Sequence, residues 1–91
     1  MSDEPALGSS DEAIASRNLQ QALEKSLSGE SLRWQNPSNG TSGTVTPVST
    51  WKTANGTYCR SYRERITLGS GESVRRNGVA CRSPEAVWRA T

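Results

Sequence analysis

The sequence contains no histidine and no phenylalanine, a single methionine and only two cysteines among its 91 residues. A structural zinc site takes four ligands, usually cysteine and histidine, so two cysteines alone do not supply one. A catalytic thiol or hydroxyl needs a neighbouring base, most often histidine, to activate it. No pair of carboxylates suited to acid–base work is visible in the second half of the chain. We therefore expect no metal, no cofactor, no catalytic residue and no enzymatic activity.

Apolar residues are also scarce, at 32% of the chain. No apolar run approaches the about 18 residues that mark a transmembrane helix, so we expect no transmembrane segment in this chain. No signal-like apolar core follows Met1, and we expect any export or lipid-anchor segment to lie outside this chain. A chain of this size buries about 60–65% of its unfolded surface. Its apolar core is therefore small, and a further source of stability is expected.

The order of patterns along the chain predicts an α+β fold, with one N-terminal helix packed on a small antiparallel sheet of about five strands. Residues 1–9 show no periodicity and are predicted to be a flexible lead-in, which leaves 10–91 as one domain. Ser9 or Ser10 is the expected N-cap of the helix, and Gly29 is placed to end it. The apolar stripe that is expected to pack on the sheet consists of Ala15, Leu19, Ala22, Leu23 and Leu27, with Ile14 at its margin.

Five β segments are predicted after the helix, because apolar and polar residues alternate between groups of turn-forming residues. Pro47 cannot donate a hydrogen bond to a ladder, so the second segment is expected to lie at an edge or to carry a bulge. Asn55-Gly56 favours a hairpin turn, and Asn77-Gly78 favours a break in the fourth segment. The predicted segments cover residues 31–36, 44–52, 57–68, 72–82 and 86–90.

The two cysteines, Cys59 and Cys81, lie at equal distances from the turn at 69–71 if segments 57–68 and 72–82 pair around it. Residues directly opposite on antiparallel strands have Cβ atoms close enough for a disulfide. The alternative is a pair of buried free thiols. We predict the disulfide, which would stabilise the domain by roughly 3 kcal/mol in the chain-entropy model. A disulfide implies an oxidising compartment.

Positive charge is concentrated in the strand half of the chain. Residues 1–30 carry six acidic and two basic residues, a net charge of −4, whereas residues 31–91 carry nine basic and three acidic residues, a net charge of +6. Six arginines on two strands that would be neighbours form the candidate interaction surface: Arg60, Arg63, Arg65, Arg75, Arg76 and Arg82.

A basic surface of this kind has two interpretations. It can bind a polyanion such as nucleic acid, the phosphates of lipopolysaccharide or an acidic glycan. It can also be a solvated sheet face whose charges deter edge-to-edge aggregation, and the interspersed Glu64 and Glu72 favour this second interpretation. Arg60 and Arg76 share the alternation of Tyr62, which places them over the aromatic side chains rather than in one patch. No recognition helix or RNA-binding aromatic motif is visible, so no specific nucleic acid is expected.

Several short motifs occur together in an order that resembles the C-terminal domain of the rickettsial 17-kilodalton surface antigen family, over roughly residues 14–90. These motifs are Gln20-Gln21-Ala22-Leu23-Glu24, Trp34-x-Asn36-Pro37, Ser42-Gly43-x-Val45-x-Pro47, Gly56-x-Tyr58-Cys59-Arg60, Ala80-Cys81-Arg82 and the late Trp88. The resemblance implies a surface-antigen-like domain of a small Gram-negative envelope protein, often a lipoprotein. It implies a location in the periplasm or at the outer membrane and cell surface.

The expected function is therefore that of a non-catalytic cell-envelope module with a structural or interaction role. Its expected partner is an envelope protein, lipopolysaccharide or peptidoglycan. The alternative is a small periplasmic or secreted inhibitor or ligand-binding protein that uses the arginine-rich strands. Members of the family commonly carry a lipidated cysteine and a glycine-rich hydrophobic segment ahead of this domain, and neither is present in this sequence.

Overall fold

The fold consists of one helix and five strands in a computed structural model, which describes residues 7–91. The elements are α1 (Ser9–Lys25), β1 (Leu32–Asn36), β2 (Thr41–Lys52), β3 (Tyr58–Thr67), β4 (Ser73–Arg82) and β5 (Trp88–Ala90). The strands form one antiparallel sheet in the order β1-β2-β3-β4-β5. The predicted α+β class is confirmed. The predicted lead-in falls mostly on residues 1–6, which lie outside the described residues, and Ser9 already belongs to α1.

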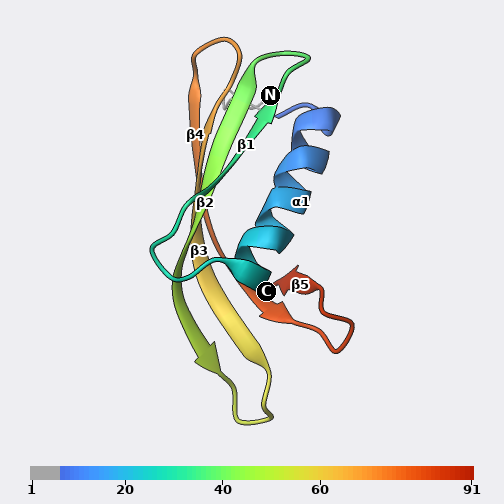
Figure 1. Cartoon of the computed structure of the whole chain (residues 1–91), viewed down its shortest axis with the longest axis vertical. Coiled ribbons are helices and arrows are strands. Elements are labelled where there is room, and N and C mark those ends of the chain that lie inside the picture. The colour runs from blue at the N-terminus through green and yellow to red at the C-terminus, as the bar shows by residue number, and fades with distance from the viewer. Residues whose placement is uncertain (1–6) are drawn as a thin grey trace, which may run out of the picture.

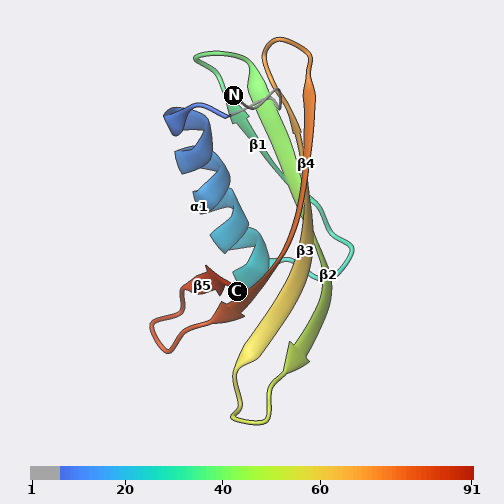
Figure 2. The same cartoon turned by 180° about the vertical axis from the view of Figure 1, so that it is seen from behind.

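The helix covers only one face of the sheet. Figures 1 and 2 show the long strands nearly edge-on, with α1 lying along one side and none of the described elements on the other. The β2–β3 hairpin extends beyond the C-terminal end of α1, and the short β5 lies beside that end of the helix (Figure 1). We call the face that packs on α1 the inner face and the opposite face the outer face.

The apolar core lies between α1 and the inner face, in two clusters. Leu23 and Ala22 pack with Val45, Tyr62 and Trp88 near the C-terminal end of α1. Towards its N-terminal end, the second cluster contains Ala15, Trp34 and Ile66. Alternation along each strand sends one set of side chains to this core and the other to the outer face.

The N-terminal end of α1 is fixed by a polar cluster rather than by the predicted serine cap. Gly8 is the N-cap, and its N–H donates to Asp11 Oδ2 at 3.2 Å. Asn36, at the end of β1, and Asn39, in the β1–β2 turn, donate their side-chain amides to Asp11 Oδ1 at 2.7 and 3.0 Å. Asp11 is therefore buried at 3% exposure with its charge stabilised, and the prediction that Ser9 or Ser10 caps the helix is wrong.

The C-terminal end of α1 comes earlier than predicted. The helix ends at Lys25 and the backbone at Ser26 is extended, so Gly29 does not end the helix. Leu27 lies outside the helix and is 71% exposed, so its assignment to the apolar stripe is wrong. The residues after Lys25 instead form the connection to β1, in which the Gly29 N–H donates to the Pro47 carbonyl at 2.8 Å.

The sequence predicted a bulge in β2 and a break in β4, and the structure contains only the bulge. The register of β2 against β3 shifts between Pro47 and Ser49, which confirms the expected bulge. By contrast, β4 continues through Asn77 and Gly78, so the predicted break is wrong. A Cβ at Gly78 would lie 2.5 Å from the Tyr62 hydroxyl, so glycine is required there by the tyrosine that packs across it rather than by a turn.

Candidate interaction surface

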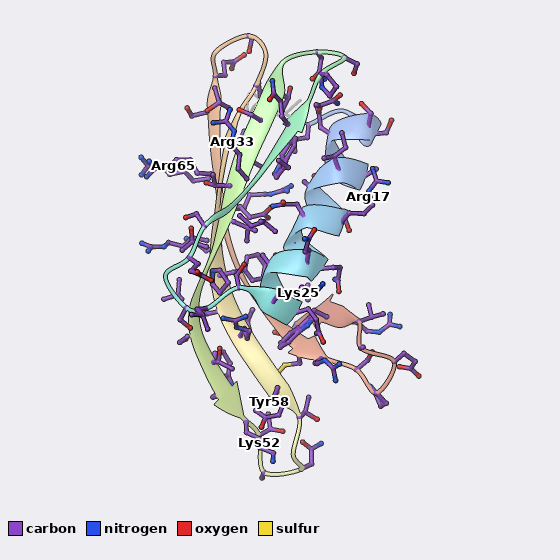
Figure 3. All side chains as sticks on the ribbon, viewed as in Figure 1. Arg17, Lys25, Arg33, Lys52, Tyr58 and Arg65 are labelled. Carbon is purple, nitrogen blue, oxygen red and sulfur yellow. A yellow bond between two sulfur atoms is a disulfide. The ribbon has the colours of Figure 1, made fainter. Side chains whose placement is uncertain are left out.

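The predicted disulfide joins Cys59 on β3 to Cys81 on β4. The two residues are register partners, with Cα atoms 4.0 Å apart, and Cys59 is 2% exposed. The sulfur–sulfur bond is visible near the lower part of β3 in Figure 3. The bridge fixes the register of the two strands that carry all six predicted surface arginines.

Arg60 lies on the inner face and is 7% exposed. Its Nη1 donates to the carbonyl oxygens of Leu23, at 2.7 Å, and Ala22, at 3.4 Å, while Nε donates to Thr50 Oγ1 at 2.7 Å. These carbonyls belong to the last turn of α1, where a positive charge is favourable against the helix dipole. Burial lowers the pKa of this guanidinium. Arg60 is therefore a buried cap of the helix and not part of an exposed surface.

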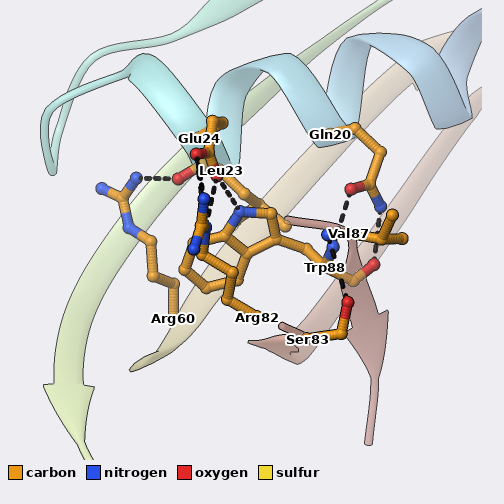
Figure 4. A network of polar contacts seen from close by, with 8 residues as sticks. All are labelled: Gln20, Leu23, Glu24, Arg60, Arg82, Ser83, Val87 and Trp88. Carbon is orange, nitrogen blue, oxygen red and sulfur yellow. Dashed lines mark hydrogen bonds and ion pairs between the residues drawn. The ribbon is translucent and has the colours of Figure 1, made fainter. Parts of the chain in front are cut away.

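Arg82 is also directed to α1, where it contacts Glu24. Its Nη2 and Nε lie 2.9 and 3.0 Å from the two carboxylate oxygens. The same carboxylate accepts a hydrogen bond from Trp88 Nε1 at 2.8 Å, and Gln20 exchanges two hydrogen bonds with the backbone of Trp88 (Figure 4). The hydrogen bonds from Arg82 and Trp88 hold the pKa of Glu24 below its usual value. This cluster attaches β5 to the helix.

Arg76, on β4, is the third predicted arginine that contacts α1. Its Nη1 lies 3.0 Å from a carboxylate oxygen of Glu12 on α1, and its Nε lies 3.3 Å from Glu64 on β3. Glu64 is 6% exposed, and burial raises its pKa, although Arg76 partly offsets the effect. Arg76 thus links the helix to the sheet.

The remaining three predicted arginines, Arg63, Arg65 and Arg75, are exposed on the outer face. The structure adds Arg33 from β1, because Arg33 pairs with Thr44 and Thr44 pairs with Arg65, which in turn pairs with Arg75. Register partners project to the same face, so one row crosses four strands. We call Arg33, Arg63, Arg65 and Arg75 the outer arginine surface. Figure 3 shows Arg65 on the side of the sheet away from α1, and Arg17 on the helix.

The outer arginine surface has no internal charge compensation among residues 7–91. All ion pairs of the described residues involve Arg76 or Arg82 on the inner face. No carboxylate of these residues lies within 4.0 Å of Arg33, Arg63, Arg65 or Arg75. Arg65 and Arg75 are directly opposite each other, an arrangement that destabilises an antiparallel pair. The neighbouring residues Thr44, Thr46 and Asn77 are neutral, and Glu64, which lines a depression with them, pairs its carboxylate with Arg76. The surface therefore carries a concentrated positive charge.

A shallow apolar depression adjoins this surface on the outer face. It has a cavity volume of about 570 Å³ and is lined by Val48 and Val79 together with Arg63 and Asn77. Val48 occupies the bulge beside Pro47 and is 46% exposed. The outer face thus presents guanidinium groups next to exposed aliphatic side chains.

The six predicted arginines consequently divide between the two faces of the sheet. Three contact α1 or the residues beneath it, and three belong to the outer arginine surface. Sequence reasoning missed Arg33, although its alternation with Leu32 and Trp34 already marked it as outward-facing. It also missed that Gln20 and Glu24 hold Trp88. Their spacing of four residues, about one helical turn, already placed both side chains on one side of the helix.

Residues 7–91 contain neither a metal-binding cluster nor a membrane-spanning helix. No group of three or more His, Cys, Asp or Glu side chains is arranged to hold a metal ion within that range. No helix of the described part is long and apolar enough to cross a membrane.

The geometry of residues 7–91 defines a small disulfide-bonded α+β domain, in which α1 covers one face of the sheet and no other described element covers the opposite face. Residues 21–89 match the family described as the 17 kDa outer membrane surface antigen. The protein named 17 kDa surface antigen of Rickettsia bellii is 42% identical over 79 residues, and those of Rickettsia felis and Rickettsia prowazekii are 40% and 38% identical over the same length. The chain belongs to the 17 kDa outer membrane surface antigen family, as its motifs predicted.

The three alignments cover 87% of this chain and 49% of each relative, so the chain spans about half the length of the curated relatives that it matches. The family description supports a location at the outer membrane or cell surface. No solved structure matches the chain.

Proposed function

We propose that residues 10–91 act as a single non-catalytic module of the cell envelope, which works by binding a neighbouring envelope component through the outer arginine surface. The observation that carries this proposal is the uncovered face of the sheet, where four arginines lie without a carboxylate partner among the described residues. Uncompensated charge on a rigid sheet favours recognition of an oppositely charged partner.

The disulfide and the family support the location in this proposal. A bridge between Cys59 and Cys81 is stable in an oxidising compartment such as the periplasm or the cell exterior. The family is described as an outer membrane surface antigen. Periplasmic and surface-exposed forms both fit the bridge.

The structural use of three carboxylates, the buried Asp11 and Glu64 and the exposed Glu24, supports a non-catalytic role. Asp11 accepts hydrogen bonds at the start of α1, Glu24 holds Arg82 and Trp88, and Glu64 contacts Arg76. Asp11 and Glu24 connect the helix to the sheet, and Glu64 connects β3 to β4 through Arg76. Proton transfer to a substrate would compete with those contacts, whose loss would weaken the fold.

The experiment is export of the chain, behind a cleavable signal, to the periplasm of a Gram-negative host. We expect the mature chain to have the mass of the disulfide form and to sediment with the outer-membrane fraction. A variant with all four outer arginines changed to Gln should keep the disulfide but move to the soluble fraction. Reduced thiols after export, or unchanged sedimentation of the variant, would contradict the proposal.

The control is Arg17→Gln/Lys25→Gln, which removes two positive charges from α1 on the opposite side of the molecule (Figure 3), and it is compared with Arg65→Gln/Arg75→Gln, which removes two from the outer arginine surface. This control should sediment like the unchanged chain. Capture of one stoichiometric protein partner, with no membrane sedimentation, would favour the alternative of a small inhibitor.

A further inference from the structure

We infer that the outer face docks on an anionic lipid surface, with the outer arginine surface contacting phosphate headgroups and Val48 contacting the apolar region beneath them. The inference rests on the proposed function, since it names the partner of the same surface. The ligand chemistry is a phosphate ester held in a membrane, as opposed to a soluble phosphate or a protein.

The spacing of the arginines fits an array of separate phosphates. Arg33, Arg65 and Arg75 lie in one row on β1, β3 and β4, with Thr44 of β2 between the first two. Neighbouring strands are about 4.8 Å apart, so the row is about 14 Å wide. Arginine binds phosphate through paired N–H groups, and a row of this width offers several such groups in one plane.

Two small depressions place hydroxyl groups beside these arginines. One, with a cavity volume of about 150 Å³, lies between Arg33 and Arg65 and is also lined by Ser42, Thr44 and Thr67. The other, of about 390 Å³, is lined by Arg63, Arg65 and Arg75 with Thr46 and Asn77. Glu64 also lines it, but its side chain is 6% exposed and its carboxylate pairs with Arg76. Guanidinium, hydroxyl and amide groups are all suitable partners for phosphate oxygens.

The apolar depression favours a lipid over other polyanions. Val48 and Val79 line it next to Arg63, so an apolar and a basic group are presented on the same face. A nucleic acid or an acidic polysaccharide offers phosphates or carboxylates without aliphatic chains. A membrane interface offers both, and surface binding there increases with buried apolar area and with attraction to anionic lipids.

The test is co-sedimentation of the purified, oxidised chain with vesicles. We expect binding to vesicles that contain phosphatidylglycerol or lipid A, no binding to phosphatidylcholine alone, and weakening as salt increases. A basic residue near an anionic surface contributes about 1 kcal/mol, which is about fivefold in affinity. Arg65→Gln/Arg75→Gln should therefore lower the partition coefficient about 30-fold.

The control variant is again Arg17→Gln/Lys25→Gln, which changes the net charge equally and should lower binding by less than a few-fold. Val48→Ser should weaken binding about threefold to fivefold, because it removes aliphatic area. Circular dichroism of each variant before and after heating verifies that it is folded.

Three results would overturn the inference. They are an equal loss of binding in the two double variants, binding of inositol hexakisphosphate without binding of vesicles, and binding to phosphatidylcholine as strong as to anionic vesicles. Failure on vesicles would leave the disulfide and the outer-membrane sedimentation of the exported chain unaffected. The lipid inference and the proposed envelope role therefore fail separately.

Discussion

The two faces of the sheet use arginine in opposite ways. On the inner face, Arg60 donates to the last carbonyls of α1, while Arg76 and Arg82 contact Glu12 and Glu24 on the same helix. On the outer face, the outer arginine surface has no such contacts among residues 7–91, and two of its members are directly opposed. The same residue type therefore stabilises the fold on one face and remains available to a partner on the other.

The number of arginines in a strand therefore says little about whether that strand binds a partner. What matters is whether a carboxylate or a helix end lies over them. The helix supplies both over the inner face, through Glu12, Glu24 and the carbonyls of its last turn. Nothing in the described part of the chain supplies either over the outer face.

The largest expected loss of stability comes from removing the disulfide, which holds the two arginine-bearing strands in register. Cys59→Ala/Cys81→Ala should lower the free energy of unfolding by about 3 kcal/mol, because the bridge closes a loop with a sequence separation of 22. In a domain of this size that corresponds to a fall in melting temperature of roughly 12–24 °C. Thermal unfolding under non-reducing conditions measures it, and an unchanged melting temperature would show that the bridge contributes nothing.

The sharpest test of the comparison is a matched pair of substitutions on β3. Arg60→Gln should lower the free energy of unfolding by about 2 kcal/mol, because it removes charged hydrogen bonds to buried carbonyls. Arg65→Gln should change it by less than about 0.5 kcal/mol, or raise it slightly, since it relieves repulsion with Arg75. Urea unfolding of both variants provides the measurement. Equal destabilisation by the two would remove the distinction between the faces.

A smaller effect is expected where an aromatic ring lies over a glycine on the inner face. A Cβ at Gly43 would be 2.7 Å from Trp34 Nε1, so Gly43→Ala should cost about 1–2 kcal/mol through displacement of the indole. Thr44→Ala, the next residue on the outer face, is the control and should cost clearly less. Near-ultraviolet circular dichroism should report the displaced tryptophan, and an unaltered spectrum with unaltered stability would count against this packing.

The smallest expected effect is a pH dependence of stability that differs among the inner-face carboxylates. The pKa of Asp11 is lowered by hydrogen bonds from Asn39 and Asn36, so its contribution is present above its unfolded pKa and is lost as pH falls through the lower folded value. Burial raises the pKa of Glu64, so the folded state gains stability as pH falls through that raised value. The free energy of unfolding, measured at a series of pH values for Asp11→Asn and for Glu64→Gln, separates the contributions of the two carboxylates.

Asp11→Asn should flatten the loss of stability below about pH 4, near the ordinary pKa of aspartate. Glu64→Gln should remove the gain in stability that the unchanged protein shows as pH falls through the raised pKa of Glu64. If Glu64→Gln leaves the whole profile unchanged, the carboxyl does not titrate differently in the folded and unfolded states.

Much of the fold followed from local patterns. The alternation in β3 and the turn at 69–71 fixed the pairing of Cys59 with Cys81, because equal spacing from a turn makes two residues opposite. Pro47 predicted a bulge because it lacks an N–H. Local patterns failed at Gly78, where a cross-strand tyrosine and not a turn explains the glycine.

The candidate surface was less predictable for a related reason. Arg76 and Glu12 are 64 residues apart, and Arg82 and Glu24 are 58 apart, so no local pattern showed that these arginines would be paired. The sequence analysis did not include Arg33, because Arg33 lies on β1, two strands away from Arg65 on β3.

The elements, the alternation of the strands, the disulfide partners and the family were predictable from the sequence, because each depends on short-range spacing or on motif order. Alternation already placed Arg60 and Arg76 on the face of Tyr62, but the packing of α1 determined which arginines meet a carboxylate and which meet solvent. The physical reason is that charge compensation acts through space: a pair of residues brought to 3 Å by the packing of a helix on a sheet has no signature in their separation along the chain.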